Sequence, residues 1–499
     1  MPDYVPTEAG DIYHVVKSEM TPYQFGVYAK IRKIEADREK NAKKQQRKKQ
    51  DDELFTIAST YRIFSRAACN FVFPEGIDRP LPNGAEEAEV DENALDLTTD
   101  PLAEGEEEQP AADADKNNYA KRIETALTMI SEVDPETNKS IHLMGDNLRT
   151  LSPKFYNVLE NISNPDNRGL HLLYSHFRTI EGIGLMKLIL LANGFAEFKI
   201  QKDKDTWTLV EDEKDIGKPT FVLYTGTETA EEKEIIRNVY NGDWNIVPVA
   251  ITNKLKERAE NNIYGEVIKV FMITSSGAEG INLKNTRFVH VVEPYWHMVR
   301  VEQVVGRARR ICSHQSLPEE LRTVEVFLYV TTFSEEQKKD EKNMELRIRD
   351  VSRLDKTTPV TTDETLYEIA SVKQRINNQI LQAVKETAID CSLYSKMNTS
   401  TKEKPMVCYG YGKVESNAFG SYPAFDMDRE QKVGLDVKTI DWDIQEVTIS
   451  DKKYALRTET MGLYDYDSYV LAVANPGLEP EYVGKLVNDK GRYKIVPPE

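Results

Sequence analysis

The sequence predicts an α/β fold, in which a parallel β-sheet is flanked by helices. From about residue 168 to residue 332, short runs of β-branched and aromatic residues alternate with segments of helical periodicity. The predicted strands cover residues 171–175, 221–224, 267–273, 288–292 and 324–330. Helices are predicted between them, at residues 181–193 and 230–240. This alternation is typical of a sheet whose neighbouring strands run in the same direction.

Changes in composition divide the chain further, because its 499 residues are too many for a single ordinary domain. The predicted parts are a junction segment with a basic helix (1–77), an acidic disordered insertion (78–117), a helical lead-in (118–165), the α/β lobe (166–335), a helical extension (336–395) and a Tyr-rich module containing β-structure (396–499).

The junction segment begins with an apolar, strand-like run at residues 12–16. Thr21 and Pro22 then predict a helix start, with Thr21 as the cap and Pro22 in the first turn. The Lys/Arg-rich stretch at 30–49 is either a phosphate-facing helix or a solvated helix face, and its composition favours the solvated face. Apolar spacing across 55–73 predicts a buried amphipathic helix that ends at Pro74.

The acidic insertion accounts for most of the negative charge. Residues 81–115 hold 13 Asp and Glu and no Lys or Arg, so the formal net charge of −18 would be −5 without them. Such a segment cannot bury enough apolar surface to offset the entropy of ordering, which predicts disorder. A local basic groove for nucleic acid therefore remains compatible with the acidic overall balance.

Helical periodicity resumes at 119–130 and again at 155–162. Beyond the predicted sheet, Thr361 and Glu364 form a possible capping box. An apolar residue then recurs at every fourth position from 372 to 388, which predicts a long helix with one apolar stripe.

No apolar run is long enough to span a membrane, and residues 1–11 lack the features of a signal peptide. We therefore expect an intracellular protein with no membrane partner. The four cysteines, Cys69, Cys312, Cys391 and Cys408, lie far apart without zinc-ligand spacing, so we expect reduced thiols and no metal site on this chain.

The clearest chemical signal begins where the third predicted strand ends. A loop of small residues follows from Thr274 to Leu283, and the carboxyl end of a sheet strand is where α/β proteins hold ligands. Gly277 and Gly280 allow the backbone to approach a phosphate or sugar closely, while the hydroxyl groups of 274–276 offer donors. An ordinary strand-to-helix turn would also contain such residues.

A second signal follows at residues 303–310, which read QVVGRARR. Gln303, Arg307 and Arg310 are spaced by four and three residues, which predicts that they share one face of a helix. Arginines offer permanently charged, bidentate hydrogen bonds that match the oxygens of a triphosphate. Gly306 is expected to permit close packing of this helix. A basic exposed helix would explain the arginines but not Gln303 and Gly306 at these positions.

With these residues in view, the sequence resembles superfamily 2 helicases. The loop GAEGINL and the helix QVVGRARR resemble their motifs V and VI, and the intervening segment 293–296 resembles a region of Snf2-like members. Residues 172–177 and 223–226 resemble motifs IV and IVa. The whole pattern is most similar to Snf2-like helicases of nucleocytoplasmic large DNA viruses over most of residues 10–395. The resemblance implies that the sheet is the second of two RecA-like lobes.

The resemblance also implies roles for individual residues. Arg310 would be the arginine finger, and Arg307 and Gln303 would touch the γ-phosphate of ATP or the attacking water. The residues expected near the nucleotide are Gly277, Gly280, Asn282 and Gly306. Those expected to face the nucleic-acid backbone are Ser175, Thr274 and Ser275. Glu279 departs from the arginine of DEAD-box RNA helicases at that position, which weakens any claim to RNA unwinding and favours DNA over RNA as the track.

The sequence contains neither the phosphate loop G-x-x-x-x-G-K-[ST] nor an acidic magnesium motif after a suitable strand. In the family, both belong to the first lobe, which also holds Mg²⁺. We therefore expect a first lobe to be supplied by another part of a larger or split polypeptide, and this chain alone to be almost inactive. If the chain is viral, we expect it in a cytoplasmic viral factory, the nucleus or the virion.

The leading interpretation is the second motor lobe of an ATP-dependent nucleic-acid helicase or translocase. The alternative is a non-catalytic docking module of a viral transcription or virion complex, in which transcription machinery is the partner. Intact residues Gln303, Arg307 and Arg310 argue against that alternative.

Overall fold

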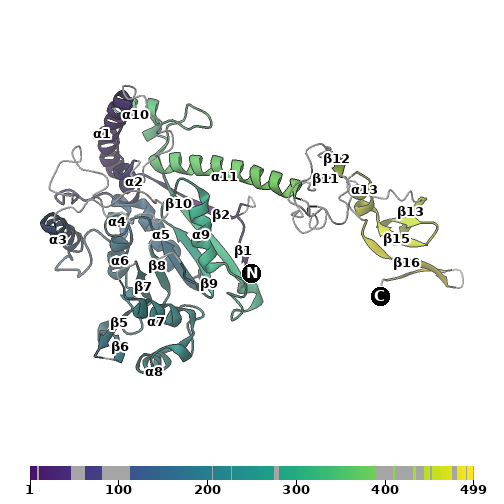
Figure 1. Ribbon diagram of the computed structural model, residues 1–499, viewed down its shortest axis with the longest axis horizontal. Helices are drawn as coiled ribbons and strands as arrows, with labels where there is room; N and C mark the ends of the chain where they lie inside the picture. Colours follow the sequence, from purple (N-terminus) through teal and green to yellow (C-terminus); the bar gives the residue numbers. More distant parts are fainter. Residues whose placement is uncertain are drawn as a thin grey trace, which may run out of the picture. The chain divides into compact units, whose positions relative to one another are not determined.

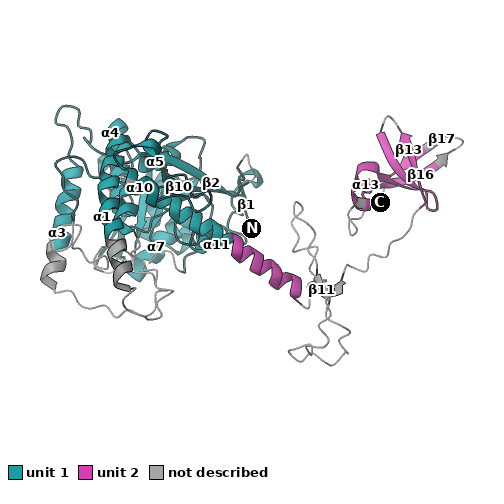
Figure 2. Cartoon of the chain, turned by 90° about the horizontal axis from the view of Figure 1, so that it is seen from above, with its two compact units in different colours: residues 1–374 teal, residues 375–499 magenta. Residues whose placement is uncertain are grey.

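The computed structural model describes residues 1–7, 11–46, 62–80, 113–204, 206–225, 228–274, 280–388, 391, 408–410, 431–433, 443–449, 452–474, 480–489 and 492–497. The chain divides into two compact units, residues 1–374 and 375–499, which are described separately (Figure 2). The predicted insertion at 78–117 lies largely outside the described residues, although residues 113–117 already belong to a helix.

A parallel sheet forms the centre of the first unit (Figure 1). Its strands are β1 (Asp3–Tyr4), β2 (Tyr13–Glu19), β3 (Leu170–Tyr174), β4 (Ala196–Glu197), β7 (Thr220–Tyr224), β8 (Val270–Ile273), β9 (Thr286–Val291) and β10 (Thr323–Thr332). The order is β1-β10-β9-β3-β8-β7-β4, with β2 also paired to β10, and each pairing is parallel. The predicted fold class and all five predicted strands are confirmed.

One predicted strand is shorter than expected. β8 begins at Val270 rather than at Val267. The backbone amides of Val267 and Ile268 instead donate to the side-chain oxygen of Asn262, at 2.8 and 2.9 Å. The two residues are fully buried, so their apolar side chains contribute to the core although their amides do not join the sheet.

Helices cover the two faces of the sheet and bury its side chains in two apolar clusters. One face packs against residues of α1 (Pro22–Gln46), α2 (Ile63–Asn70), α5 (Pro153–Ser163) and α6 (Ile183–Ala192). The other face packs against α7 (Ala230–Asn241), α8 (Val249–Arg258) and α9 (Met298–Ala308). Alternate strand residues point to opposite clusters, as Leu172 and Leu173 do in β3. The predicted helices at 181–193 and 230–240 are confirmed as α6 and α7.

The junction segment differs in part from its prediction. The amide of Gln24 donates to the Thr21 hydroxyl at 3.1 Å, which confirms the cap of α1. Arg32 is only 1% exposed and donates to Asp350 at 2.7 Å, so this cation of the basic stretch is neither solvated nor free to bind phosphate. α2 ends at Asn70 rather than at Pro74, because Phe71 adopts an extended conformation.

Several elements were not predicted. The hairpin of β5 (Lys199–Asp203) and β6 (Thr206–Val210) stands beside the main sheet, and α8 follows α7. Two further unpredicted helices are α4 (Gly145–Leu151) and α10 (Met344–Arg349). By contrast, α3 (Asp113–Ile130) and α5 confirm the helical periodicity predicted at 119–130 and 155–162. No helix among the described residues is both long and apolar enough to cross a membrane.

A chain of buried hydrogen bonds crosses the centre of the sheet. His171 Nδ1 and His290 Nε2 are 2.9 Å apart, and His290 Nδ1 is 2.9 Å from the hydroxyl of Tyr329. The ends of the chain are the carbonyl of Asn167 and the side-chain amide of Asn161. Every ring nitrogen is satisfied when both imidazoles are neutral. Burial accordingly lowers the pKa of His290 to about 3.

The predicted long helix is α11 (Thr362–Thr387). Its capping box is confirmed, because Thr361 Oγ1 accepts from the amide of Glu364 and Glu364 accepts from the amide of Thr361. The stripe residues Ile376 and Ile380 are 49% and 56% exposed.

The second unit contains the small β-structure predicted near the C-terminus. The strands β13 (Ile444–Ile449), β14 (Lys452–Arg457), β15 (Gly462–Asp465), β16 (Tyr482–Asp489) and β17 (Arg492–Val496) form an antiparallel sheet, with α13 (Tyr466–Ala474) beside it and a separate pair of β11 (Cys408–Gly410) and β12 (Gln431–Val433). Leu456, Leu463 and Leu486 form its core. The prediction of four reduced thiols is wrong for Cys391, which is disulfide-bonded.

Candidate functional site

Helix α9 carries two of the three predicted catalytic residues. Its valines at 301, 304 and 305 are buried against the sheet. Gln303 is exposed and Arg307 is half-buried, so both belong to the opposite side of this amphipathic helix. The predicted helix placement is right for these two residues.

The prediction is wrong for Arg310, which lies beyond the helix. α9 ends at Ala308, and Arg309 adopts φ −95° and ψ 78°. The backbone amide of Arg310 then donates to Ser313 Oγ at 3.3 Å. Its Nε donates to the carbonyl of Gly306 at 3.3 Å, which brings the side chain back over the last turn of the helix. Arg310 therefore remains beside the helix end although it is not part of the helix.

The predicted loop and this helix end are joined directly. The amide of Leu283 donates to the carbonyl of Arg307 at 3.1 Å. Asn241, the last residue of α7, fixes the same loop, because it donates to the Asn282 carbonyl at 2.9 Å and accepts from the Lys284 amide at 2.8 Å. The backbone thus holds the Asn282 region against the Arg307 turn.

Gly280 and Asn282 are exposed on this loop. Gly280 has φ +71°, a conformation that glycine adopts without strain, and no atom of the described residues lies within 4 Å of the position of an added Cβ. Gly306 likewise has no described neighbour at that position, so the prediction that it permits close helix packing is wrong for the described part of the chain. Ser275 and Gly277 lie outside the described residues.

The two described residues expected to face nucleic acid are buried. Thr274 and Ser175 both have 0% exposed surface. Ser175 Oγ donates to the carboxylate of Glu293 at 3.1 Å, and Thr274 Oγ1 donates to the Thr225 carbonyl at 3.4 Å. A role at the nucleic-acid backbone stays a prediction for both, and their hydroxyls are engaged inside the protein in this structure.

Glu293 is the centre of a buried polar cluster at the carboxyl ends of the strands, and no sequence pattern predicted this cluster. It accepts from Ser175 Oγ and from the amide of His176. Asn70 lies 3.4 Å from the same carboxylate and accepts from Lys154 at 2.8 Å. Burial raises the pKa of Glu293, while Lys154 and the hydrogen bonds act to lower it.

The cluster continues to the start of α11 through an ion pair. Lys154 Nζ donates to the carboxylate of Asp363, and neither side chain is more than 1% exposed. Asp363 also accepts from the amide of Thr331, at the end of β10, at 3.0 Å. The pair therefore links α5, β10 and α11 beneath the carboxyl edge of the sheet.

The N-terminal strand β1 supports the segment that contains Arg310. Arg309 Nε donates to the carbonyl of Pro2 at 2.8 Å, and its guanidinium carbon lies 4.2 Å from the ring centre of Tyr4. β1 itself pairs with residues 323 and 324 of β10. The turn after α9 is thus held by the opening residues of the chain.

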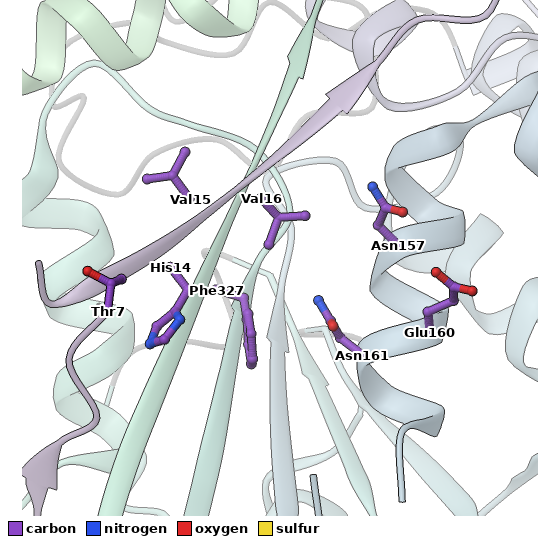
Figure 3. Close-up of a pocket in the computed structure, with 8 residues that line it drawn as sticks. All are labelled: Thr7, His14, Val15, Val16, Asn157, Glu160, Asn161 and Phe327. Atoms are coloured by element: carbon purple, nitrogen blue, oxygen red, sulfur yellow. The ribbon is translucent and has the colours of Figure 1, made fainter. Parts of the chain in front are cut away.

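A cavity of about 400 Å³ lies elsewhere, between β2, β10 and α5 (Figure 3). Its lining residues are Thr7, His14, Val15, Val16, Asn157, Glu160, Asn161 and Phe327, which include none of the predicted site residues. The described residues also contain no group of three His, Cys, Asp or Glu side chains that could hold a metal ion.

Comparison with known proteins identifies part of this site. Residues 201–312 match the family described as "Helicase conserved C-terminal domain". The match spans the hairpin β5–β6, the Gly280 loop and α9. This part of the chain is thus similar to helicase C-terminal domains.

Relatives are found among large DNA viruses. The chain is 25% identical to "Putative ATP-dependent RNA helicase R350" of Acanthamoeba polyphaga mimivirus, over 84% of this chain and 48% of the relative. It is 32% identical to "Termination factor NPH-I homolog" of African swine fever virus (isolate Pig/Kenya/KEN-50/1950), over 49% of this chain and 33% of that protein. The chain therefore spans about half or less of these relatives. Together with the domain match, they confirm the resemblance to superfamily 2 helicases of large DNA viruses.

A solved structure titled "Crystal structure of the C-terminal part of Fun30 ATPase domain" matches with 12% identity and a TM-score of 0.35, covering 76% of this chain and 99% of that chain. A TM-score this low carries no argument about the fold.

Proposed function

We propose that the chain acts as the second motor lobe of an ATP-dependent, Snf2-like nucleic-acid helicase or translocase. In this proposal, a first lobe outside these residues binds ATP and Mg²⁺, and the carboxyl edge of the present sheet closes on the triphosphate. The first lobe belongs to the same or to a split polypeptide. The relatives named as ATP-dependent helicases support this proposal.

The observation that carries the proposal is the joining of two predicted motifs at one exposed edge. The Leu283 amide donates to the Arg307 carbonyl, so the loop that contains the exposed Gly280 is joined to the last turn of α9, which bears Arg307. A triphosphate needs an accessible backbone and converging cationic donors, and this edge offers both.

In this proposal, each polar residue of this edge has a role in binding the triphosphate or in its hydrolysis. Gln303 and Arg307 would bind the γ-phosphate or orient the attacking water. Among the described residues, Arg310 forms a side-chain hydrogen bond only through Nε, so its two Nη groups can donate to phosphate oxygens. A guanidinium in that place stabilises the charge that develops on the transferring phosphoryl group. Bound ATP with Mg²⁺ supplies the reacting phosphate and its counter-charge.

We propose nucleic acid as the track, with DNA favoured over RNA, and a location inside the cell. Transcription machinery is a further candidate partner, because one relative is named a termination factor. That name favours the second candidate function, a docking module of a viral transcription complex. A docking module requires no ATP turnover, which separates the two candidates.

In the test, the chain is expressed as a fusion with the polypeptide that carries the proposed first lobe. ATP turnover is measured without nucleic acid and with single-stranded DNA, duplex DNA or RNA. We expect at least one of them to stimulate turnover, and Arg310→Ala to reduce it by about 10³-fold or more. Arg237→Ala, which removes a partly exposed arginine of α7, is the matched control and should keep full turnover. Equal turnover in Arg310→Ala would remove that residue from its proposed role, and absence of any stimulation would favour the docking module.

A further inference from the structure

Three cations gather at the amino ends of three neighbouring strands. This edge of the sheet is opposite the carboxyl edge, to which the proposed function assigns the triphosphate. Arg168 precedes β3, Lys269 precedes β8, and Arg287 is the second residue of β9. Because β3 lies between β8 and β9 and all three run in parallel, their amino ends meet. We call Arg168, Lys269 and Arg287 the amino-end cluster.

Backbone and side-chain hydrogen bonds bring the cluster together. Arg287 Nη1 donates to the carbonyl of Arg168 at 2.7 Å, and the amide of His171 donates to the carbonyl of Lys269 at 2.9 Å. Gly169 lies between them, and a Cβ added there would approach Arg287 Cδ to 3.1 Å. The absence of a side chain at Gly169 therefore lets Arg287 lie flat across the strand ends.

No carboxylate of the described residues forms an ion pair with these cations. Two acidic groups of this region have other contacts: Glu266 accepts from the amide of Tyr264, and Glu325, whose charge also acts on Arg287 without a direct ion pair, lies 3.7 Å from His14. Arg287 Nε is buried, and it has no hydrogen-bond partner in the described part of the chain. Burial lowers the pKa of Lys269 and that of Arg287. Lys269 and Arg287 are partly desolvated cations beside the exposed Arg168, and holding three like charges together is costly, so a bound anion would offset that cost.

We infer that the amino-end cluster binds phosphate groups of a nucleic-acid backbone. This contact would be separate from the carboxyl edge of the sheet. The paired N–H groups of a guanidinium can donate two hydrogen bonds to the oxygens of one phosphate. The Arg168 guanidinium carbon lies 4.1 Å from the ring centre of Tyr264, and this stacking restrains the guanidinium. Aromatic side chains among cations are typical of surfaces that bind single-stranded nucleic acid. The four residues of β8 lie between Lys269 and Thr274, which are therefore about 16 Å apart, so the two edges would contact different stretches of the nucleic acid.

The inference rests on the proposed function only in taking nucleic acid as the ligand, so its test measures binding by the chain alone. Fluorescence anisotropy follows a labelled 30-nucleotide single strand and a 30-base-pair duplex at several salt concentrations. The double variant Arg168→Gln/Lys269→Met should bind the single strand about tenfold more weakly at 0.1 M salt. Its salt slope should fall by about 1.4, which corresponds to two phosphate contacts.

Two controls address fold and charge. Lys139→Met removes an exposed lysine from the loop between α3 and α4 and should leave the affinity unchanged. Lys269→Arg retains the charge and should bind like the unaltered chain, and urea unfolding should show that each variant folds. Competition with 10 mM inorganic phosphate should have little effect on binding, whereas unlabelled DNA should displace the probe.

The outcomes separate the two proposals. Binding by the unaltered chain with no loss in the double variant would overturn this inference and leave the motor proposal intact. Absence of any binding by the unaltered chain would count against both. Displacement of the probe by polyglutamate as efficiently as by DNA would show that the cluster takes acidic peptides, and would also overturn the inference.

Discussion

The ion pair between Lys154 and Asp363 gives a sharp test of what holds the carboxyl edge together. Both side chains are buried, and Asp363 Oδ2 receives both the ammonium group and the Thr331 amide. In Asp363→Asn, the amide oxygen can still accept from Thr331, but Lys154 is left as a buried cation without its counter-charge. Breaking a buried pair from one side costs about 3–5 kcal/mol, so we expect the free energy of unfolding of unit 1 to fall by that amount.

Urea unfolding followed by tryptophan fluorescence measures this loss, because Trp207, Trp244 and Trp296 all lie in unit 1. With an m-value of about 3 kcal/mol/M, the midpoint should fall by about 1–1.7 M. The double variant Lys154→Met/Asp363→Asn removes both charges and should recover most of the loss. Glu335→Gln breaks an exposed pair with Lys338 and should leave the midpoint unchanged. A double variant as unstable as the sum of its single variants would refute the argument, since the two charges would then be independent.

Two further predictions concern the sheet and the Arg310 segment. The pKa of His290 is about 3 in the folded protein, below the roughly 6.5 of an unfolded histidine, so only the unfolded state gains a proton as the pH falls through 6.5. The free energy of unfolding should therefore decrease by about 1.4 kcal/mol from this residue between pH 7.5 and pH 5.5. His290→Asn should show a smaller decrease in urea unfolding, and an unchanged pH dependence in this variant would contradict the assignment. Tyr4→Ala removes the ring that contacts Arg309. Because a cation–π contact contributes about 1 kcal/mol, amide hydrogen exchange at residues 309–313 should become about fivefold faster. Tyr4→Phe keeps the ring and should exchange at the rate of the unaltered chain. Equal exchange in Tyr4→Ala would mean that β1 does not support this segment.

Local sequence patterns were enough to predict those elements of the fold that depend on residues close together in the sequence. The strand at 324–330 and the capping box of Thr361 were predicted because β-branched runs and a Thr-x-x-Glu spacing act within a few residues. The hairpin β5–β6 was missed because the charged residues at 199–205 break the apolar alternation.

The site was harder to predict, because its details depend on contacts between distant segments. The spacing of Gln303 and Arg307 correctly placed both on one helix, but the same rule failed at Arg310, where bonds to Ser313 and Gly306 follow the helix end. Glu293 pairs with Ser175, 118 residues away, and periodicity says nothing of such a partner. The amino-end cluster depends on strand order, which spacing within one segment cannot reveal.

The pairing of β2 with β10 has a consequence for synthesis of the protein. Tyr13 aligns with Val326, 313 positions later, so the edge of β10 gains this neighbour only after nearly all of unit 1 has left the ribosome. Until then β2 has no β10 to pair with, and pairing across such a separation is slow. The unpaired edge of β2 can form hydrogen bonds with strands of other chains. Newly made copies should therefore be most prone to aggregate before β10 emerges from the ribosome.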